Sequence, residues 1–481
     1  MKRTLPAAIA NLLVIALVIV IFSGAFSGAA ESAGEVSGRF DGVLEENTTL
    51  RILENDTAIK QGYFDALLTA FNAQYAAQGI TAVDANMDSY LDLEQDGPYG
   101  YGPDVIYQAN DQVMKYTDGN HILPLPVEQL DCYAQTAQTA WDAYTIGDGQ
   151  YYGVPVNVQA PVLYYRKDLL PANWETDWDD DSNGTPDMLE DWGAMYRFSQ
   201  QIKTESGGTK FGYMKSLYDT YFASGYLFSY GAYVFGPNND TSDVGFAAGN
   251  AEIGAGVIRQ LAGVMNEGCI DDTITVDCYS RLASGEYFAT MTTPDLYTMF
   301  IRELQLVYTA EGLSEEDALA KAAENLGTAT VPALPENGDL SDETSPLIPC
   351  KAMGGINGYA ISSYTKAPDA CLAFIDFATS FEMLLTRNEM LGIVPARSDA
   401  ANSVGGLTGM VNQILGEGNL VIMPSSRALQ QVWTPMETLL SDIAKDPFRP
   451  ESEIKYPDLP SLKAGLEKAD QQIYDAIWTL S

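Results

Sequence analysis

The feature that most constrains the fold is an alternation of short apolar strands and helix-period segments before residue 158. The segments 49–53 (TLRIL), 80–85 (ITAVDA) and 103–108 (PDVIYQ) read as strands. Between the first two, apolar side chains recur on one helical face, at Tyr63, Phe64, Leu67, Leu68, Phe71 and Tyr75. Strands that alternate with helices build a mainly parallel sheet with crossover helices. The sequence therefore predicts an α/β fold.

The chain is too long for one ordinary hydrophobic core. With 481 residues, of which 46% are hydrophobic, it predicts two or more globular domains. After residue 158 the pattern changes to longer helices, expected at 192–204, 217–230, 249–268 and 311–326. Residues 332–349 are rich in Pro, Gly and acidic side chains and read as a loop, whereas the C-terminal third is mostly helical in pattern. No internal repeat relates these parts.

The net charge limits the partners of the protein. The 65 acidic and 26 basic residues give a formal charge of −39, which should repel nucleic acid and anionic membrane surfaces. The absence of a basic cluster also disfavours a polyanionic ligand. Acidity by itself names no ligand, because a solvated acidic surface explains it equally well.

The N-terminus carries an export signal. Lys2 and Arg3 precede an apolar run from Leu5 to Phe26, and small residues follow it. The run approaches the ~20 residues that span a bilayer, so residues 1–30 are either a retained membrane anchor or a signal peptide cleaved after Ala30. No Cys lies near this segment, which excludes attachment through a lipidated cysteine. Either way we expect the body of the protein outside the cytoplasm, after a polar linker at 31–47.

The five cysteines leave at least one thiol free or paired between chains. Cys269 and Cys278 bracket a short acidic turn, and Cys350 and Cys371 form a second candidate pair for an oxidising compartment. Buried free thiols are the alternative. The cysteine spacings fit no zinc motif, and the single histidine, His121, adds no partner.

A calcium loop is expected at residues 179–190. The spacing fits the twelve-position loop, in which oxygen ligands alternate around a glycine turn at Gly184. Pro186 departs from the EF-hand, so the loop is more similar to the calcium repeats of thrombospondin-type extracellular proteins. A solvated acidic loop with chance spacing is the alternative. The expected Ca²⁺ ligands are Asp179, Asp181, Asn183, Thr185, Asp187 and Glu190.

Four blocks, in the expected order, carry a resemblance to a known family. They are VPVNVQAPVLYYRKDLL (154–170), GPDVIYQANDQ (102–112), LGIVPARSDA (391–400) and MPSSRALQQVW (423–433). The first reads as a strand that runs into a helix-like pattern beginning at Tyr164-Tyr165-Arg166. Together the blocks resemble the bacterial extracellular solute-binding proteins of the maltose-binding type, from about residue 48 to the C-terminus.

This resemblance implies a type II periplasmic-binding-protein fold with two hinged α/β lobes. Lobe 1 would take residues 48–157 and 332–388, and lobe 2 residues 158–331 and 389–481, with the calcium loop as an insertion. The ligand would bind between the lobes and stabilise closure. The implied function is that of the binding subunit of an ABC-type sugar importer, which delivers a neutral di- or oligosaccharide to a membrane permease. We expect the protein to be a monomer.

The resemblance also assigns candidate ligand residues. Sugar sites stack aromatic faces on the ring and point carboxylates and amides at the hydroxyls. In lobe 1 the candidates are Asp56, Gln108, Asp111 and Gln112; Gln108 stands where the family has a stacking Trp and Gln112 where it has an Arg. For Asp56, a simple helix cap is the alternative.

On the strand that crosses between the lobes, Gln159 takes the position of a binding Glu. In lobe 2, Asp295 takes that of a stacking Trp. The block MKSLYDTYF (214–222) supplies an acid and a tyrosine, and Trp433 aligns with the late stacking Trp. A place in the core is the alternative for the aromatic residues. The candidates are Gln159, Asp219, Tyr221, Asp295, Tyr297 and Trp433.

Two other functions stay open at this stage. A polyamine or peptide would suit acidic ligand residues, and a secreted glycoside hydrolase needs only two positioned carboxylates. No hydrolase block, phosphate-binding loop or dinucleotide signature is visible, and one histidine disfavours Ser-His-Asp or Cys-His catalysis. We therefore expect a binding protein with no catalytic residues.

Overall fold

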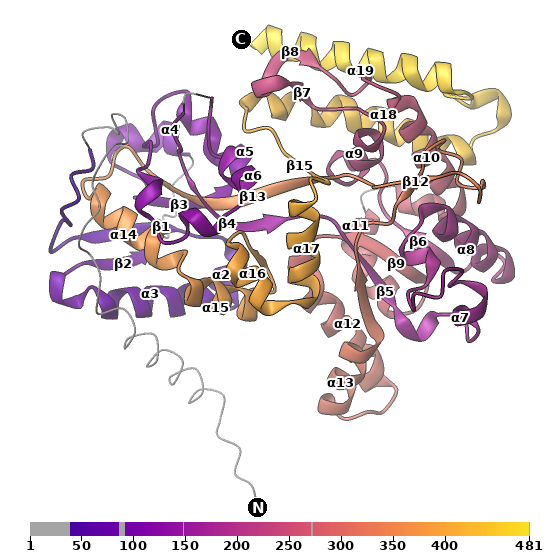
Figure 1. Cartoon of the computed structure of the whole chain (residues 1–481), viewed down its shortest axis with the longest axis horizontal. Coiled ribbons are helices and arrows are strands. Elements are labelled where there is room, and N and C mark those ends of the chain that lie inside the picture. The colour runs from indigo at the N-terminus through magenta and orange to yellow at the C-terminus, as the bar shows by residue number, and fades with distance from the viewer. Residues whose placement is uncertain (1–38, 86–91, 148, 271–272, 481) are drawn as a thin grey trace, which may run out of the picture. The chain divides into compact units, whose positions relative to one another are not determined.

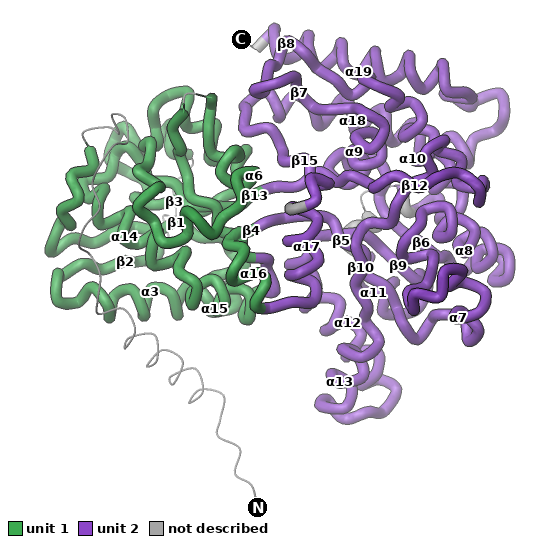
Figure 2. Tube along the Cα trace, viewed as in Figure 1, with its two compact units in different colours: residues 1–157, 356–391, 395–403 green, residues 158–355, 392–394, 404–481 purple. Residues whose placement is uncertain are grey.

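The computed structural model describes residues 39–85, 92–147, 149–270 and 273–480 (Figure 1). The chain forms two compact units (Figure 2). Unit 1 holds residues 1–157, 356–391 and 395–403, and unit 2 holds residues 158–355, 392–394 and 404–481. Residues 332–355 thus lie in unit 2, and residues 389–391 and 395–403 lie in unit 1, whereas the sequence assigned them to the opposite lobes. The expected export segment lies outside the described residues.

Unit 1 is built on a sheet in which β1 (Thr49–Leu53) is the second strand from one edge. β2 (Thr81–Asp84) and β3 (Val105–Ala109) both pair with it in parallel. The C-terminal half of β13 (Ala352–Ile361) pairs antiparallel with β3, and β4 (Val154–Gln159) and β14 (Val394–Pro395) extend the sheet. Leu50 and Ile52 are buried while their neighbours in β1 are not, which is the alternation of a strand that packs on one face.

Helix α3 (Tyr63–Gln74) covers this sheet with the predicted apolar face. Tyr63, Phe64, Leu67 and Phe71 are fully buried, and the Phe71 ring lies 5.1 Å from that of Phe374 in α14 (Pro368–Ala378). Helix α15 (Phe381–Leu391) also packs on α3. The expected strands and first helix of this unit are therefore present.

The expected linker is in part a bound arm. The Arg39 guanidinium donates to the carbonyls of Ser363 and Thr365 at 3.2 and 2.8 Å. The Glu45 carboxylate accepts from the N–H groups of Asp369 and Ala370, in the first turn of α14. A carboxylate at this position satisfies donors that a helix N-terminus leaves free. Residues 39–47 therefore belong to unit 1.

Unit 2 contains a second sheet in the order β10-β5-β9-β6. β5 (Val162–Arg166) pairs antiparallel with β9 (Tyr287–Thr292) and with β10 (Leu326–Ala329), and β6 (Phe211–Met214) pairs in parallel with β9. All residues of β6 and β9 are buried. The prediction of a helix-like segment from Tyr164 is wrong. The buried Tyr164 lies in a central strand, and only a short 3₁₀ turn, Lys167–Leu169, follows it.

The helices of unit 2 pack closely around α10 (Ala251–Val264). Its neighbours are α9 (Thr220–Ser229), α18 (Trp433–Lys445) and α19 (Leu459–Leu480), which lie together in Figure 1. Gly254 permits the contact with α9, because a Cβ there would lie 2.3 Å from the Tyr226 carbonyl oxygen.

Other expected helices appear with shifted ends. α8 spans Trp192–Glu205, and α13 spans Glu315–Asn325 behind a Ser314 cap; α12 (Tyr297–Ala310) and α11 (Thr273–Ala283) were not predicted. The expected loop 332–349 contains a short antiparallel pair, β11 (Leu334–Pro335) and β12 (Leu347–Ile348). Within the described ranges, no helix is both long and apolar enough to cross a membrane.

The candidate disulfide between Cys350 and Cys371 is absent from the structure. Cys132, Cys350 and Cys371 are free and buried. The Cys350 and Cys371 thiols contact Ser229 and Thr365 instead of each other. The side chain of Cys269 lies outside the described part of the structure, so the pairing of Cys269 with Cys278 stays a prediction.

Candidate functional site

The end of β3 brings together three of the predicted ligand residues of unit 1. Gln108 lies in β3 opposite Gly358, and its side-chain Oε1 is buried without a hydrogen-bond partner in the described structure. Asp111 follows in the short helix α5 (Asn110–Met114), where Gln112 Nε2 donates to its Oδ2 at 2.7 Å. Burial raises the pKa of Asp111, although the bonds from Gln112 oppose this. This edge therefore offers acceptor oxygens that are shielded from water.

Asp56 does not share this environment. It is the first residue of helix α2 (Asp56–Lys60), is exposed, and forms an ion pair with Lys60 at 2.8 Å, which lowers its pKa. The helix cap is the preceding residue, Asn55, whose side chain accepts from the Ala58 N–H. Asp56 is therefore not a helix cap, and its carboxylate lies at the surface in the ion pair with Lys60.

A buried charged network lies directly behind these residues. Both Glu54 oxygens accept from the Arg387 guanidinium at 2.9 and 3.0 Å, and the Tyr359 hydroxyl donates to Glu54 at 2.6 Å. The guanidinium carbon lies 4.1 Å from the centre of the Tyr107 ring. Because Tyr107 precedes Gln108 in β3, and Glu54 directly follows β1, the network fixes the ends of both strands to α15. Sequence reasoning missed it, since 333 residues separate the two charged partners.

In unit 2, Gln159 and Tyr221 meet at the end of β4. The Tyr221 hydroxyl donates to the Gln159 backbone oxygen at 3.3 Å, which leaves the tyrosine ring half-buried. Gln159 Oε1 is buried and lacks a hydrogen-bond partner among the described residues. Burial, followed by the charges of Asp295 and Asp219, raises the pKa of Tyr221. Tyr221 is therefore an orienting group as well as an aromatic surface.

Asp219 has a local structural role. It is the N-cap of α9, and its carboxylate accepts from the Tyr221 N–H at 3.0 Å. Such a cap satisfies one of the free donors of the first helical turn. Through this bond Asp219 also fixes the residue that carries the candidate stacking ring.

Asp295 lies among several tyrosines. Its Oδ1 is buried and has no hydrogen-bond partner in the described structure, and its charge contributes, after burial, to the raised pKa values of Tyr164, Tyr221 and Tyr279. The structure therefore brings Asp295 near Tyr221. Tyr297 begins α12 and is half-buried, with its ring 6.4 Å from that of Tyr164.

Trp433 is the first residue of α18 and is half-buried. Trp141 and Trp192, by contrast, are among the largest fully buried side chains. Unlike those two residues, Trp433 does not lie in the core. No described contact joins it to the other candidates.

The predicted calcium loop closes around Asn183. Its side-chain amide donates to Asp181 at 3.1 Å and to both Glu190 oxygens at 3.0 and 3.2 Å, while Asp179 accepts from the backbone of Asn183 and Gly184. Gly184 has φ +82°, as the turn position requires. Burial and the charges of neighbouring aspartates raise the pKa of Asp187, against a backbone bond from Asp180. Within the described residues, no group of three or more His, Cys, Asp or Glu side chains is arranged to hold a metal ion.

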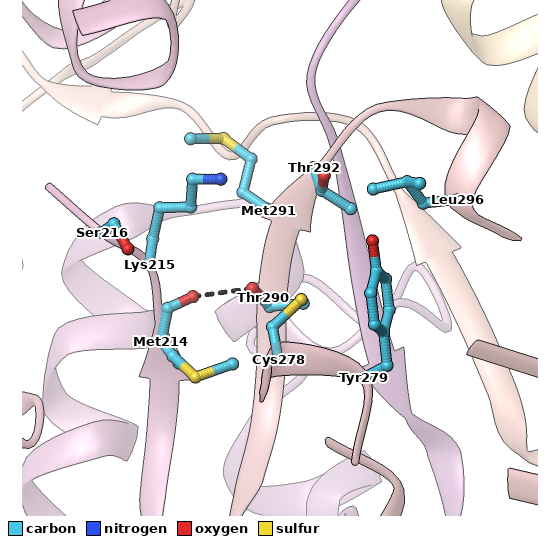
Figure 3. Close-up of a pocket in the computed structure, with 9 residues that line it drawn as sticks. All are labelled: Met214, Lys215, Ser216, Cys278, Tyr279, Thr290, Met291, Thr292 and Leu296. Atoms are coloured by element: carbon cyan, nitrogen blue, oxygen red, sulfur yellow. Dashed lines mark hydrogen bonds between the residues drawn. The ribbon is translucent and has the colours of Figure 1, made fainter. Parts of the chain in front are cut away.

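Sequence reasoning did not find a pocket at the end of β6 and β9 (Figure 3). The cavity itself is small, about 20 Å³, and it opens to solvent. Lys215 is the charged residue in its wall, and Thr290 Oγ1 donates to the Met214 carbonyl at 2.9 Å. The lining residues are Met214, Lys215, Ser216, Cys278, Tyr279, Thr290, Met291, Thr292 and Leu296.

The fold has solved counterparts. The maltose-binding periplasmic protein MalE of Listeria monocytogenes, solved in complex with maltose, matches with a TM-score of 0.65 and 22% identity over 90% of this chain and 98% of that one. A cyclo/maltodextrin-binding protein complexed with maltotetraose matches with a TM-score of 0.66 and 18% identity, over 91% and 99%. These likenesses confirm the expected type II periplasmic-binding-protein fold.

The chain belongs to the family described as bacterial extracellular solute-binding protein, which matches residues 66–406. Two relatives come from Bacillus subtilis strain 168. A galactooligosaccharide-binding protein is 24% identical over 371 residues, covering 76% of this chain and 77% of the relative. The maltodextrin-binding protein MdxE is 25% identical over 390 residues, covering 79% and 82%. Membership of this family confirms that the chain is a solute-binding protein and not an enzyme. It also agrees with the expected export from the cytoplasm.

Proposed function

We propose that this protein is the substrate-binding component of an ABC-type sugar importer, which captures a neutral di- or oligosaccharide and delivers it to a membrane permease. The observation that carries the proposal is a set of unsatisfied acceptors. Gln108, Gln159 and Asp295 each have a buried side-chain oxygen with no hydrogen-bond partner among the described residues. All three belong to the ligand set expected from the sequence.

A buried acceptor without a partner costs about 1–3 kcal/mol, so folded proteins rarely leave one unpaired without water or a ligand. Saccharide hydroxyls are the donors that such oxygens need. A phosphate or carboxylate ligand offers acceptors instead and would leave these oxygens unpaired. The unpaired oxygens therefore favour a neutral polyol.

The aromatic candidates supply apolar contact. Tyr221, Tyr297 and Trp433 are half-buried residues and not part of the fully buried core. A flat ring stacks on the C–H face of a sugar, while neighbouring oxygens select its hydroxyls. The names of the relatives, which refer to galactooligosaccharide and maltodextrin binding, support the same class of ligand.

Isothermal titration calorimetry of the full-length chain tests the proposal. The probes are maltotriose, maltopentaose, galactotriose, spermidine and trialanine. Saturable binding of at least one saccharide, with no product detected by chromatography, is the expected result. Binding of spermidine or trialanine alone would reject the sugar assignment, and cleavage of the saccharide would reject a pure binding function.

We propose that the protein acts outside the cytoplasm as a monomer, either released after cleavage at Ala30 or held by its N-terminal segment. Mass spectrometry of the protein recovered from an expressing cell distinguishes the two fates. Retention of Met1 supports the anchor, and a chain that begins at Glu31 supports cleavage.

We further propose that Ca²⁺ binds the loop 179–190. Burial and then the charges of neighbouring aspartates raise the pKa of Asp187, and a cation would relieve this crowding of negative charge. Calcium at about 100 times its dissociation constant would stabilise the fold by about 2.7 kcal/mol. We expect a chelator to lower the melting temperature and calcium to restore it in the parent protein. The variant Asp181→Asn should lose this response; an unchanged melting temperature of the parent would contradict the proposal.

A further inference from the structure

Lys215 follows β6 and is buried, with 5% of its surface exposed. Its side chain forms part of the pocket wall, and Figure 3 shows its amino group at the same end of the pocket as Met291 and Thr292. A lysine this buried usually has an ionic or hydrogen-bonding partner. Lys215 is therefore a residue whose surroundings require an explanation.

The ammonium group of Lys215 has no hydrogen bond or ion pair with any described residue. The group lies over the ring of Phe222, whose centre is 3.2 Å from Nζ. A ring face offsets part of the charge but accepts none of the three N–H donors in a directed hydrogen bond. Burial lowers the pKa of Lys215 to about 8, against the opposing charge of Asp219. At neutral pH the pocket thus holds unsatisfied donors.

The pocket adjoins the candidate ligand residues of unit 2. Leu296 lines the pocket and follows Asp295, and the Asp295 charge acts on Tyr279, another lining residue. Asp219, which caps the helix of Tyr221, acts on Lys215 itself. The N–H donors of Lys215 and the acceptor oxygen of Asp295 therefore lie in the same part of unit 2.

We propose that Lys215 contacts the ligand, with its ammonium group donating a hydrogen bond to a saccharide hydroxyl oxygen. This inference rests on the proposed sugar-binding function and deepens it. The two neighbouring aspartates make a carboxylate an unfavourable partner, because an anionic sugar would be attracted by one charge and repelled by two. Lys215 thus complements the acceptors Gln159 and Asp295 and selects for neutral sugars.

The test compares Lys215→Met with the control Lys167→Met, which removes an exposed lysine of the same unit. Calorimetry with maltotriose and galactotriose measures affinity, and thermal unfolding without sugar measures stability. Lys215→Met should weaken binding by about tenfold or more, since bonds to charged donors are strong. Its melting temperature should not fall, because Met replaces an unpaired buried charge. Lys167→Met should change neither quantity.

The outcomes distinguish a failure of the role of Lys215 from a failure of the sugar-binding function. Parent-like affinity of Lys215→Met for a saccharide that the parent binds would overturn the role of Lys215 and leave the sugar function intact. A lower melting temperature with unchanged affinity would assign Lys215 to support of Phe222 alone. If the parent binds no saccharide, the proposed function fails, and the role of Lys215 fails with it.

A pH profile of the parent protein provides a second measurement if Lys215→Met does not fold. Lys215 faces Asp219, Cys278 and Tyr279, and burial raises the pKa of Tyr279 to about 12. Because the amine loses its charge as the pH rises past 8, affinity should fall about threefold or more between pH 7 and pH 9.5. Constant affinity over this interval would overturn the inference.

Discussion

Two buried cations, one in each unit, show opposite solutions to the same physical problem. Arg387 in unit 1 is bound by both oxygens of Glu54 and lies between aromatic rings. Lys215 in unit 2 has a ring beneath it and no acceptor in the described structure. A paired buried charge stabilises a fold, whereas an unpaired one destabilises it unless a ligand completes it. The contrast separates a structural cation from a binding cation.

The largest expected effect follows from breaking the paired cation. Arg387→Met leaves Glu54 buried without its partner, so we expect the free energy of unfolding to fall by about 3–5 kcal/mol. Urea denaturation measures the change. The double variant Glu54→Gln, Arg387→Met should lose less, because it also removes the stranded carboxylate. A loss below about 1 kcal/mol in the single variant would contradict a structural role for the pair.

A partly satisfied carboxylate provides an intermediate case. Asp470 in α19 accepts from the N–H groups of Phe246 and Ala247 at 3.0 and 2.8 Å, yet burial raises its pKa to about 6. Since the folded state prefers the protonated form, the group destabilises the fold progressively as the pH rises from about 4 to 6.

Asp470→Asn removes this titration. The stability of the variant relative to the parent should therefore increase by about 2 kcal/mol between pH 4 and pH 7. Denaturation at both pH values measures the change. Asp475→Asn, an exposed substitution on the same helix, is the control and should show no such trend. A difference that does not vary with pH would show that Asp470 titrates normally.

The smallest expected effect concerns an uncharged unpaired atom. Gln159→Leu removes a buried acceptor that has no described partner, so the stability of the ligand-free protein should stay level or rise. Affinity for maltotriose should fall about tenfold if that oxygen accepts a sugar hydroxyl. Gln201→Leu, on the exposed side of α8, is the matched control. Reduced stability with unchanged affinity would place Gln159 among the structural residues.

Local patterns in the sequence predict much of unit 1. The strands near Leu50, Val83 and Ile106 and the apolar face of α3 follow from short-range periodicity, which survives in the fold because each element packs on one side. The same approach failed at Tyr164. A short apolar run fits a buried strand or a buried helix, and its neighbours β9 and β10, distant in the chain, decide between them.

The candidate site was predictable only in part. Resemblance supplied Gln108, Gln159 and Asp295, but the absence of partners for their oxygens is a property of three-dimensional packing. Lys215 lies within a block that had already supplied Asp219 and Tyr221, yet nothing in its spacing indicates burial. Pairing of Glu54 with Arg387 depends on strand β1 and helix α15 meeting across 333 positions of the chain.

The arm at residues 39–47 has a consequence for maturation. Arg39 and Glu45 tie it to the loop before α14 and to the first turn of that helix. A protease that trims the chain ahead of Arg39 would leave every one of these ties in place. A trimmed and an untrimmed chain should therefore form the same folded domain. If the N-terminal segment stays in the membrane, tension on it would act on the contacts with α14 before it acted on the first strand.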